Sequence, residues 1–272
     1  MVLEFIVSGA LVGFIVGATG VGGGSLMTPL LTLAFGVPAP VAVGTDLLFA
    51  AVTKSGGAFA YARRGHIPWN IVSWMAMGSI PAALVTLAAV RAWQPDPAQL
   101  GAFVRPTLGF ALLLTAAAIA LRTQIQALGR RVMVAGPALA TAGTALGTPE
   151  QGASIRPAFT LAVGALIGSL VSITSVGAGA IGVMALFFLY PTMPARLLIG
   201  ADIVHAVPLT LIAGLGHAAL GTVNWTMLLG LLIGSLPAIH LGAALAGRLP
   251  ERALRSFLAL MLLLIGARLL WV

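Results

Sequence analysis

Long apolar stretches fill most of the chain, and short polar or arginine-containing turns separate them. A helix that crosses the hydrocarbon core of a bilayer needs about 20 apolar residues, at about 1.5 Å each. Six stretches have this length: about 44–62, 71–92, 104–121, 198–216, 226–247 and 255–271. The pattern therefore predicts six spanning helices in an all-α, polytopic membrane protein.

Two further apolar stretches, 3–36 and about 158–190, are too long for one straight span, and a glycine cluster interrupts each of them. The pieces on either side, such as 3–18 and 25–36, would form helices of about 24 Å and about 18 Å, against a hydrocarbon core of about 30 Å. Each stretch is therefore either a re-entrant hairpin that returns to its own side or one broken helix that crosses.

The second half of the chain repeats the first in outline. The matches are Gly9-Ala-Leu-Val-Gly13 with Gly164-Ala-Leu-Ile-Gly168, Thr19-Gly-Val-Gly-Gly-Gly24 with Thr174-Ser-Val-Gly-Ala-Gly179, Asp46 with Asp202, Gly65…Trp69 with Gly221…Trp225, and Gly78-Ser-Ile-Pro-Ala82 with Gly234-Ser-Leu-Pro-Ala238. Duplicated halves with glycine-interrupted hydrophobic segments in matching places are typical of secondary transporters, whose substrate binds near the bilayer midplane.

The distribution of arginine distinguishes the two topologies, because cytoplasmic loops carry an excess of Lys and Arg. If both broken stretches cross, the arginines divide seven against six between the two sides. If both re-enter, they divide ten against three: Arg63, Arg64, Arg122, Arg130, Arg131, Arg156, Arg196, Arg248, Arg252 and Arg255 against Arg91, Arg105 and Arg268. The second solution has the expected bias. It places both termini outside the cytoplasm and inverts the second repeat relative to the first.

The expected domain organisation is one integral membrane domain. Residues 1–125 form the first membrane repeat, 126–157 a cytoplasmic linker and 158–272 the second membrane repeat. Each repeat consists of a glycine-broken, re-entrant hairpin and three spanning helices. The sequence does not indicate an oligomeric state.

Composition excludes several other classes of protein. With 60% hydrophobic and 7% charged residues, the chain lacks the polar surface of a water-soluble globule. Its net charge of +8 comes from scattered arginines without a basic stripe or an aromatic platform, so no nucleic-acid partner is expected. The chain has no cysteine, and its four histidines lack metal-ligand spacing, so neither a metal nor any other cofactor is implied. No serine, histidine and acid arrangement predicts an enzyme.

The glycine clusters are the strongest candidate for a binding site. Glycine lets two backbones approach closely and exposes N–H groups that lipid cannot satisfy. The half-helices that begin near Ser25 and Ala180 would direct their positive N-terminal ends at the same point, which favours an anion. The candidate substrate-binding residues are Thr19, Gly22, Gly23, Gly24, Ser25, Thr174, Ser175, Gly177, Ala178 and Gly179. The alternative is that small residues only allow tight helix packing.

Four ionisable residues inside predicted spans complete the candidate site. Lys54 is the one mid-span cation; it either binds the substrate anion or is a structural partner of backbone carbonyls or a carboxylate. We place it about ten residues into its helix, at the depth of the hairpin tips. Asp46 and Asp202 occupy matching positions that we place in the first helical turn, where they are either caps or coupling groups. His205 is three residues after Asp202, so we expect the two side chains on one helix face, where they could carry protons.

These residues resemble the TauE/SafE sulfite exporters, also called the 4-toluene sulfonate uptake permeases. The resemblance covers nearly the whole chain except 126–157. Its most specific marks are Gly17-Ala-Thr-Gly-Val-Gly-Gly-Gly24 with Pro29 following, Ala42-Val-Gly-Thr-Asp46, and Gly200-Ala-Asp202. Many relatives have serine where this sequence has Asp46, so the carboxylate there points to a subgroup with different coupling or substrate.

The resemblance implies transport of small sulfur-containing anions such as sulfite, sulfoacetate or related organosulfonates. The expected protein is therefore a secondary transporter of the bacterial inner membrane that works by alternating access and is coupled either to protons or to the membrane potential. A passive anion channel and a membrane-embedded enzyme or accessory subunit are the alternatives. The sequence leaves open the direction of transport.

Overall fold

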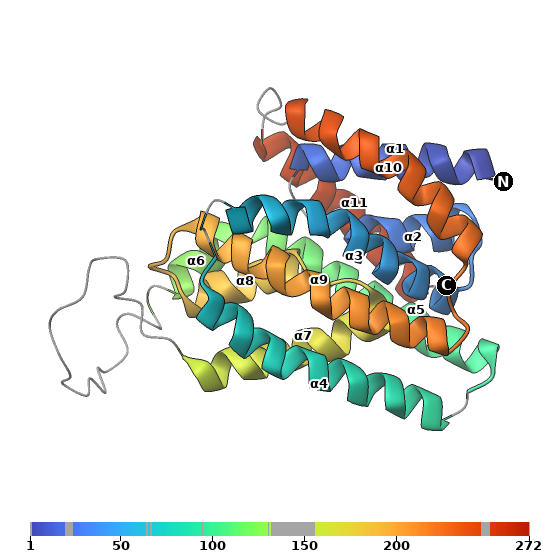
Figure 1. The fold of residues 1–272 in the computed structure, drawn as a ribbon, viewed down its shortest axis with the longest axis horizontal. Helices are drawn as coiled ribbons and strands as arrows, with labels where there is room; N and C mark the ends of the chain where they lie inside the picture. Colours follow the sequence, from blue (N-terminus) through green and yellow to red (C-terminus); the bar gives the residue numbers. More distant parts are fainter. Residues whose placement is uncertain are drawn as a thin grey trace, which may run out of the picture.

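The computed structural model describes residues 2–19, 24–63, 65, 67–93, 95–129, 131, 156–245 and 251–271. Every regular element in these ranges is helical (Figure 1). The helices are α1 (Val2–Thr19), α2 (Gly24–Ala34), α3 (Ala39–Arg63), α4 (Trp69–Trp93), α5 (Pro97–Ala120), α6 (Arg122–Gly129), α7 (Pro157–Thr174), α8 (Ala180–Leu189), α9 (Ala195–Ala219), α10 (Trp225–Leu245) and α11 (Glu251–Trp271). The all-helical prediction is confirmed for the described residues.

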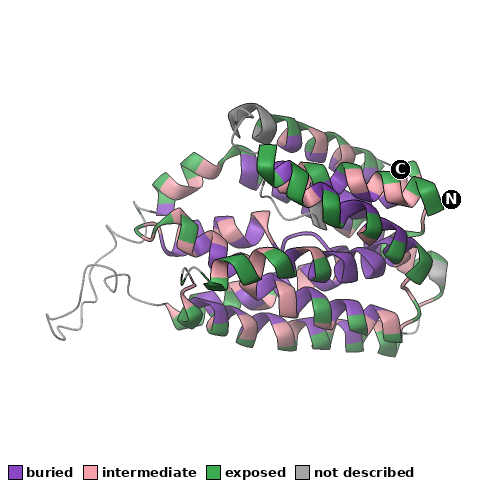
Figure 2. Cartoon of the chain, turned by 45° about the horizontal axis from the view of Figure 1, so that its top comes forward, coloured by how far each residue is buried: buried purple, intermediate pink, exposed green. Residues whose placement is uncertain are grey.

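Five of the described helices are long and apolar enough to cross a membrane. They lie at Trp69–Trp93, Ala98–Ala120, Pro157–Thr174, Ala195–Ala219 and Trp225–Leu245. Large apolar side chains cover the outside, for example Leu241 at 62% exposed and Ile233 at 62% exposed. Figure 2 shows the buried residues turned toward the interior and the exposed ones along the outer ridges. A surface of this kind is stable in lipid rather than in water, so the chain is a multi-pass membrane protein.

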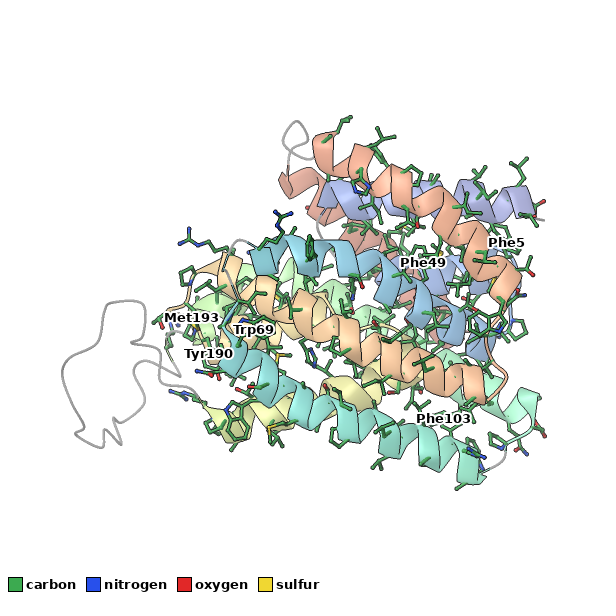
Figure 3. The ribbon with its side chains drawn as sticks, viewed as in Figure 1. Phe5, Phe49, Trp69, Phe103, Tyr190 and Met193 are labelled. Carbon is green, nitrogen blue, oxygen red and sulfur yellow. The ribbon has the colours of Figure 1, made fainter. Side chains whose placement is uncertain are left out.

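Each glycine-interrupted stretch folds back on itself. The ring of Phe5, near the start of α1, lies 5.6 Å from that of Phe35, just after α2. In the second half, the Thr160 hydroxyl near the start of α7 lies 2.6 Å from the Tyr190 hydroxyl, which follows α8. Figure 3 places Phe5 and Tyr190 near opposite ends of the bundle, so the two hairpins enter the molecule from opposite ends.

The arms of these hairpins are unequal in length. Helix α1 and helix α7 each have 18 residues, whereas α2 has 11 and α8 has 10. At about 1.5 Å per residue, the first arms reach about 27 Å and the returning arms only about 15 Å. The break between α7 and α8 lies inside the bundle, where Ser175 and Val176 are buried, and each returning helix is shorter than the helix before it.

The first helix of each hairpin packs on the fourth helix of the other half, α1 on α10 and α7 on α4. A Cβ atom added to Gly9 would overlap the backbone of Leu231 in α10, and one added to Gly164 would overlap the backbone of Met75 in α4. The repeat register matches Gly9 with Gly164 and Leu231 with Met75. Because glycine has no side chain, the helix backbones come into direct contact, as in small-xxx-small packing. Equivalent helices thus make equivalent contacts: α1 with α10, and α7 with α4 (Figure 1).

Helices α3 and α9 pack against each other in the middle of the bundle, and α5 packs against α11. Both central helices begin earlier than the sequence predicts, because proline starts them: Pro38 precedes α3, and Pro194 is the N-cap of α9. Proline favours the first positions of a helix, where its missing N–H costs nothing. The prediction that Asp46 and Asp202 lie in the first turn is therefore wrong, since neither helix has an acidic residue there.

The position of Lys54 and two other helix boundaries also differ from the sequence prediction. Lys54 lies past the middle of α3, not about ten residues into it, because the helix starts at Ala39. Helix α5 begins at Pro97, where the Asp96 side chain accepts a hydrogen bond from the Gln99 N–H at 2.7 Å and caps the helix. Helix α6 extends to Gly129, so the first residues of the expected 126–157 linker are helical. Most of that linker lies outside the described residues.

Candidate functional site

The break between α7 and α8 is an irregular backbone segment. Ser175 adopts the left-handed conformation with φ 58° and ψ 0°, and Gly177 and Gly179 have φ values of 119° and 139°. A left-handed conformation is uncommon for any residue but glycine, and such positions often occur at functional sites. The Thr174 hydroxyl stabilises the turn by donating to the Leu170 carbonyl at 2.7 Å. Thr174 therefore has a structural partner already.

The corresponding break in the first half lies largely outside the described residues. Gly22 and Gly23 are not described. Thr19 ends α1, Gly24 begins α2 and Ser25 follows it, but the side chains of Thr19 and Ser25 are not described. This half of the predicted glycine site stays a prediction from the sequence.

Lys54 reaches from α3 to the second break. Its side chain is buried, and the ammonium Nζ donates a hydrogen bond to the Ala178 carbonyl oxygen at 2.5 Å. Both Asp46 and Asp202 interact electrostatically with this ammonium. A buried ammonium is costly unless it is paired, and here a backbone carbonyl accepts its hydrogen bond while two carboxylates interact with its charge. Lys54 thus joins the central helix pair to the tip of the second hairpin.

Asp46 is anchored to the first hairpin. Its Oδ2 accepts a hydrogen bond from the Thr28 hydroxyl of α2 at 2.5 Å. Ser175 lies next to the same carboxylate, although neither the Ser175 Oγ nor the Asp46 Oδ1 has a hydrogen-bond partner among the described residues. The repeat does not indicate Thr28 as a site residue, because its counterpart in the second half is the apolar Val183.

Asp202 is buried without a partner for its carboxylate. It is 1% exposed, and within the described part of the chain neither oxygen accepts a hydrogen bond. The carboxylate lies against Gly182 in the first turn of α8, where a Cβ atom added to the glycine would overlap Asp202 Oδ1. Buried polar groups in native proteins nearly always have partners, so the state of Asp202 is unusual.

His205 turns to a different neighbour from the one that the sequence spacing indicates. Its Nε2 lies 2.7 Å from the Ser79 hydroxyl of α4. No hydrogen bond joins His205 to Asp202 in the described structure, and His205 Nδ1 has no partner there. Ser79 belongs to the repeated Gly-Ser-x-Pro motif, so this motif contributes a polar group as well as a proline. Its contact partner could not be read from the repeat, because Phe49 takes the place of His205 in the first half.

His217 is a second histidine that sequence reasoning set aside. It lies 5% exposed near the end of α9, with Nε2 2.8 Å from the Ser172 carbonyl and Nδ1 2.8 Å from the Thr222 hydroxyl. Both ring nitrogens are therefore engaged, and the contacts join α7 to the turn before α10. This arrangement indicates a structural histidine.

A cavity of about 400 Å³ opens beside the first hairpin. It is lined by Thr32, Gly36, Val37, Pro38, Ala39, Ala98, Gly101, Ala102 and Arg105. Thr32 lies one turn after Thr28, and Arg105 is the one charged residue of the lining. Arg105 thus gives this cavity a positive charge.

The central residues are sealed from both ends of the bundle: Asp46 is 0% exposed, Asp202 1%, Ser175 2% and His205 0%. They combine one ammonium, two carboxylates and a free hydroxyl at the break between two half-helices. No group of His, Cys, Asp and Glu that could hold a metal is found among the described residues. A multi-pass helical protein with a polar site enclosed between two broken helices has the architecture of a membrane transporter.

Comparison with known proteins agrees with that class. The chain belongs to the sulfite exporter TauE/SafE family, whose family model matches residues 5–269. "Probable membrane transporter protein YjnA" of Bacillus subtilis is 31% identical over 270 residues, which are 99% of this chain and 100% of the relative. A "probable membrane transporter protein" of Xylella fastidiosa is 28% identical, covering 97% of this chain and 93% of the relative. No solved structure matches the chain.

Proposed function

We propose that this protein is a secondary transporter that moves small sulfur-containing anions, such as sulfite, sulfoacetate or related organosulfonates, across the bacterial inner membrane. The substrate is held between the two glycine-rich breaks, and access alternates between the two sides. The observation that carries the proposal is the pair of hairpins that enter from opposite ends and converge on a sealed polar site. The family supplies the chemical class of the substrate.

An anion fits this site for two reasons. The first N–H groups of a helix lack intrahelical partners. In α8, Gly182 and Val183 donate theirs to the Gly177 and Gly179 carbonyls, which leaves the N–H groups of Ala180 and Ile181 at the break. The Lys54 ammonium and the free Ser175 hydroxyl are additional donors within the same region. Sulfonate and sulfite oxygens are hydrogen-bond acceptors that such donors recognise.

The opposed hairpins support the proposal of alternating access. Helices α1 and α2 are joined to one end of the bundle, and α7 and α8 to the other (Figure 1). Movement of one half against the other would open the site to one end while the opposite hairpin closes it. In this scheme the repeats are inverted, the broken segments are re-entrant, and both termini are extracytoplasmic with the 126–157 linker in the cytoplasm.

Uptake into proteoliposomes tests the proposal. The purified protein should accumulate labelled sulfite or sulfoacetate with saturable kinetics, and an imposed pH gradient should drive accumulation above equilibrium. Empty liposomes and liposomes with the Ala178→Leu variant are the controls. Flux that neither saturates nor moves uphill would indicate a passive channel, and product formation without flux would indicate an enzyme. Absence of flux for every anion tested would reject the proposal.

A further inference from the structure

We propose that Asp202 is a resident anion of the substrate site, and that substrate binds only when the Asp202 carboxylate is protonated. The inference deepens the proposed function and rests on it. It identifies one residue as the group through which anion binding is linked to uptake of one proton. It also assigns different roles to the two carboxylates that the repeat pairs.

The first argument is the position of the carboxylate. Asp202 Oδ1 lies against Gly182, two residues after Ala180 at the start of α8. The beginning of a helix attracts negative charge, because its N–H groups point outward and the helix dipole is positive there. Asp202 belongs to α9. Its carboxylate is therefore a negative group that another helix holds at the start of α8, where a substrate anion would be stabilised.

The second argument is the lack of any fixed partner for the carboxylate. Both Asp202 oxygens are buried without a hydrogen bond among the described residues. A carboxylate with a purely structural role would be expected to have its acceptors satisfied. Asp46 differs, because Thr28 donates to it at 2.5 Å. The repeat-related pair is therefore asymmetric: Asp46 is fixed, and Asp202 is free to change its charge or position.

The third argument is the balance of charge. Among the described residues, the charged group that interacts with Asp202 is Lys54 on α3, and the same ammonium interacts with Asp46. His205 lies on the same helix and is directed at Ser79, and the described parts of α7 and α8 contribute no charged side chain to the site. With Lys54, Asp46 and Asp202 all ionised, the net charge is already negative, so a further anion is repelled. Protonation of Asp202 removes one negative charge, and a monovalent anion then restores it.

This step moves one proton from water to the Asp202 carboxylate and breaks no other bond. The neutral carboxylic acid no longer competes for the start of α8, and its O–H is an additional donor for a sulfonate oxygen. Release of the anion on the other side allows the proton to leave as well. Transport would therefore move one proton with each monovalent anion.

Proton counting during binding tests the inference on the wild-type protein. Calorimetry with methanesulfonate, a monovalent anion, in buffers of different ionisation enthalpy should report uptake of about one proton per anion bound. This probe keeps its single charge across the pH range in which protein carboxylic acids titrate. Above the pH at which Asp202 ionises, the affinity for the anion should fall by up to about tenfold for each pH unit.

The Asp202→Asn variant should bind the same probe with no proton uptake and with an affinity that changes little with pH. The matched control is Asp96→Asn, the same chemical change at the exposed cap of α5, where asparagine caps as well as aspartate. This control should keep the wild-type proton uptake. Gly182→Ala, whose methyl group displaces the Asp202 carboxylate, should also reduce proton uptake.

The outcomes are distinguishable. Binding by the wild type without proton uptake would overturn the role of Asp202 and leave the proposed transport function in place; this result needs no variant to fold. Unchanged proton uptake in a folded Asp202→Asn variant would overturn it too. Failure of the wild type to bind methanesulfonate, sulfoacetate and sulfite at every pH would reject the proposed function itself, and this inference with it.

Discussion

The Lys54 ammonium of α3 donates a hydrogen bond to the Ala178 carbonyl, 124 positions along the chain, at 2.5 Å. A single side chain thereby ties the central helix pair to the tip of the second hairpin. Its repeat counterpart is Thr210, whose hydroxyl bonds to the Ala206 carbonyl of its own helix. Only the first of the two repeat-related positions therefore makes this long-range hydrogen bond. The two halves of the site differ here, although the sequence is repeated.

Replacement of Lys54 tests whether its charge binds the substrate. Lys54→Met should weaken anion binding by at least about tenfold, equal to about 1.4 kcal/mol, because it removes the one cation of the described site. Lys54→Arg should keep part of the affinity, since the charge remains although its geometry changes. Calorimetry on the purified variants measures both effects. Normal binding by a folded Lys54→Met protein would make the lysine a structural tie and move the anion site wholly to the glycine breaks.

A bulky residue at either glycine-rich break should abolish transport. Gly23→Leu and Ala178→Leu would each fill the space in which backbone N–H groups meet the anion. Membrane insertion should be unaffected, because both changes are apolar. Uptake into proteoliposomes and the amount of protein in the membrane fraction give the two readouts.

Gly56→Leu is the control for this pair. Gly56 lies in α3, and a Cβ atom added there meets nothing within 4 Å. This variant should transport at nearly the wild-type rate. Full activity of both Gly23→Leu and Ala178→Leu would rule out a binding site at the breaks.

The positive charge beside the first hairpin should assist anion entry. Arg105→Gln should raise the KM for uptake by about threefold at low salt and leave the maximal rate unchanged, because long-range attraction affects encounter more than turnover. The difference should shrink as salt screens the charge. Arg91→Gln at the end of α4 is the control, since Arg91 does not line the cavity. An equal effect of both changes would argue against a specific entry route.

The proposed topology predicts how single cysteines react in whole cells. The chain has no native cysteine, so Gln99→Cys and Gln124→Cys each give a protein with one thiol. Both positions are exposed. A membrane-impermeant maleimide should label Gln99→Cys in intact cells and Gln124→Cys only in inside-out vesicles.

Reporter fusions check the same topology at other points. Both termini should report an extracytoplasmic location, and the 126–157 segment a cytoplasmic one. A cytoplasmic C-terminus would contradict the inverted arrangement. Labelling of Gln124→Cys in intact cells would contradict it independently.

Helices and their breaks could be predicted well, because both depend on local properties. Apolar length located α4, α5, α9 and α10, and the glycine clusters placed the ends of α1, α2, α7 and α8 within a few residues. Gly65 and Gly221, matched in the repeat, both adopt positive φ, at 66° and 73°, and each precedes the tryptophan that begins the next helix. Here the repeated residues have the same conformation for the same steric reason.

Long-range partners could not be predicted in the same way. Nothing local to Asp46 indicates Thr28, and nothing local to His205 indicates Ser79, because these contacts depend on how α2 and α4 pack against the central helices. The spacing of Asp202 and His205 correctly puts them on one helix, but neighbouring elements decide where each side chain points. The apolar pattern places the starts of α3 and α9 too late, because these helices begin directly after Pro38 and Pro194.

The packing of each hairpin against a helix of the other half has a consequence for biosynthesis. Gly9 in α1 meets the backbone of Leu231 in α10, and Gly242 in α10 meets that of Phe14 in α1. The chain is synthesised from its N-terminus. Helix α1 therefore enters the bilayer long before its partner α10 exists, whereas α4 and its partner α7 are closer in the sequence and meet earlier. Contacts that close such long loops form late. The first hairpin to be synthesised is therefore among the last to reach its final packing, and until α10 arrives its glycine face is exposed to lipid and to quality-control proteases.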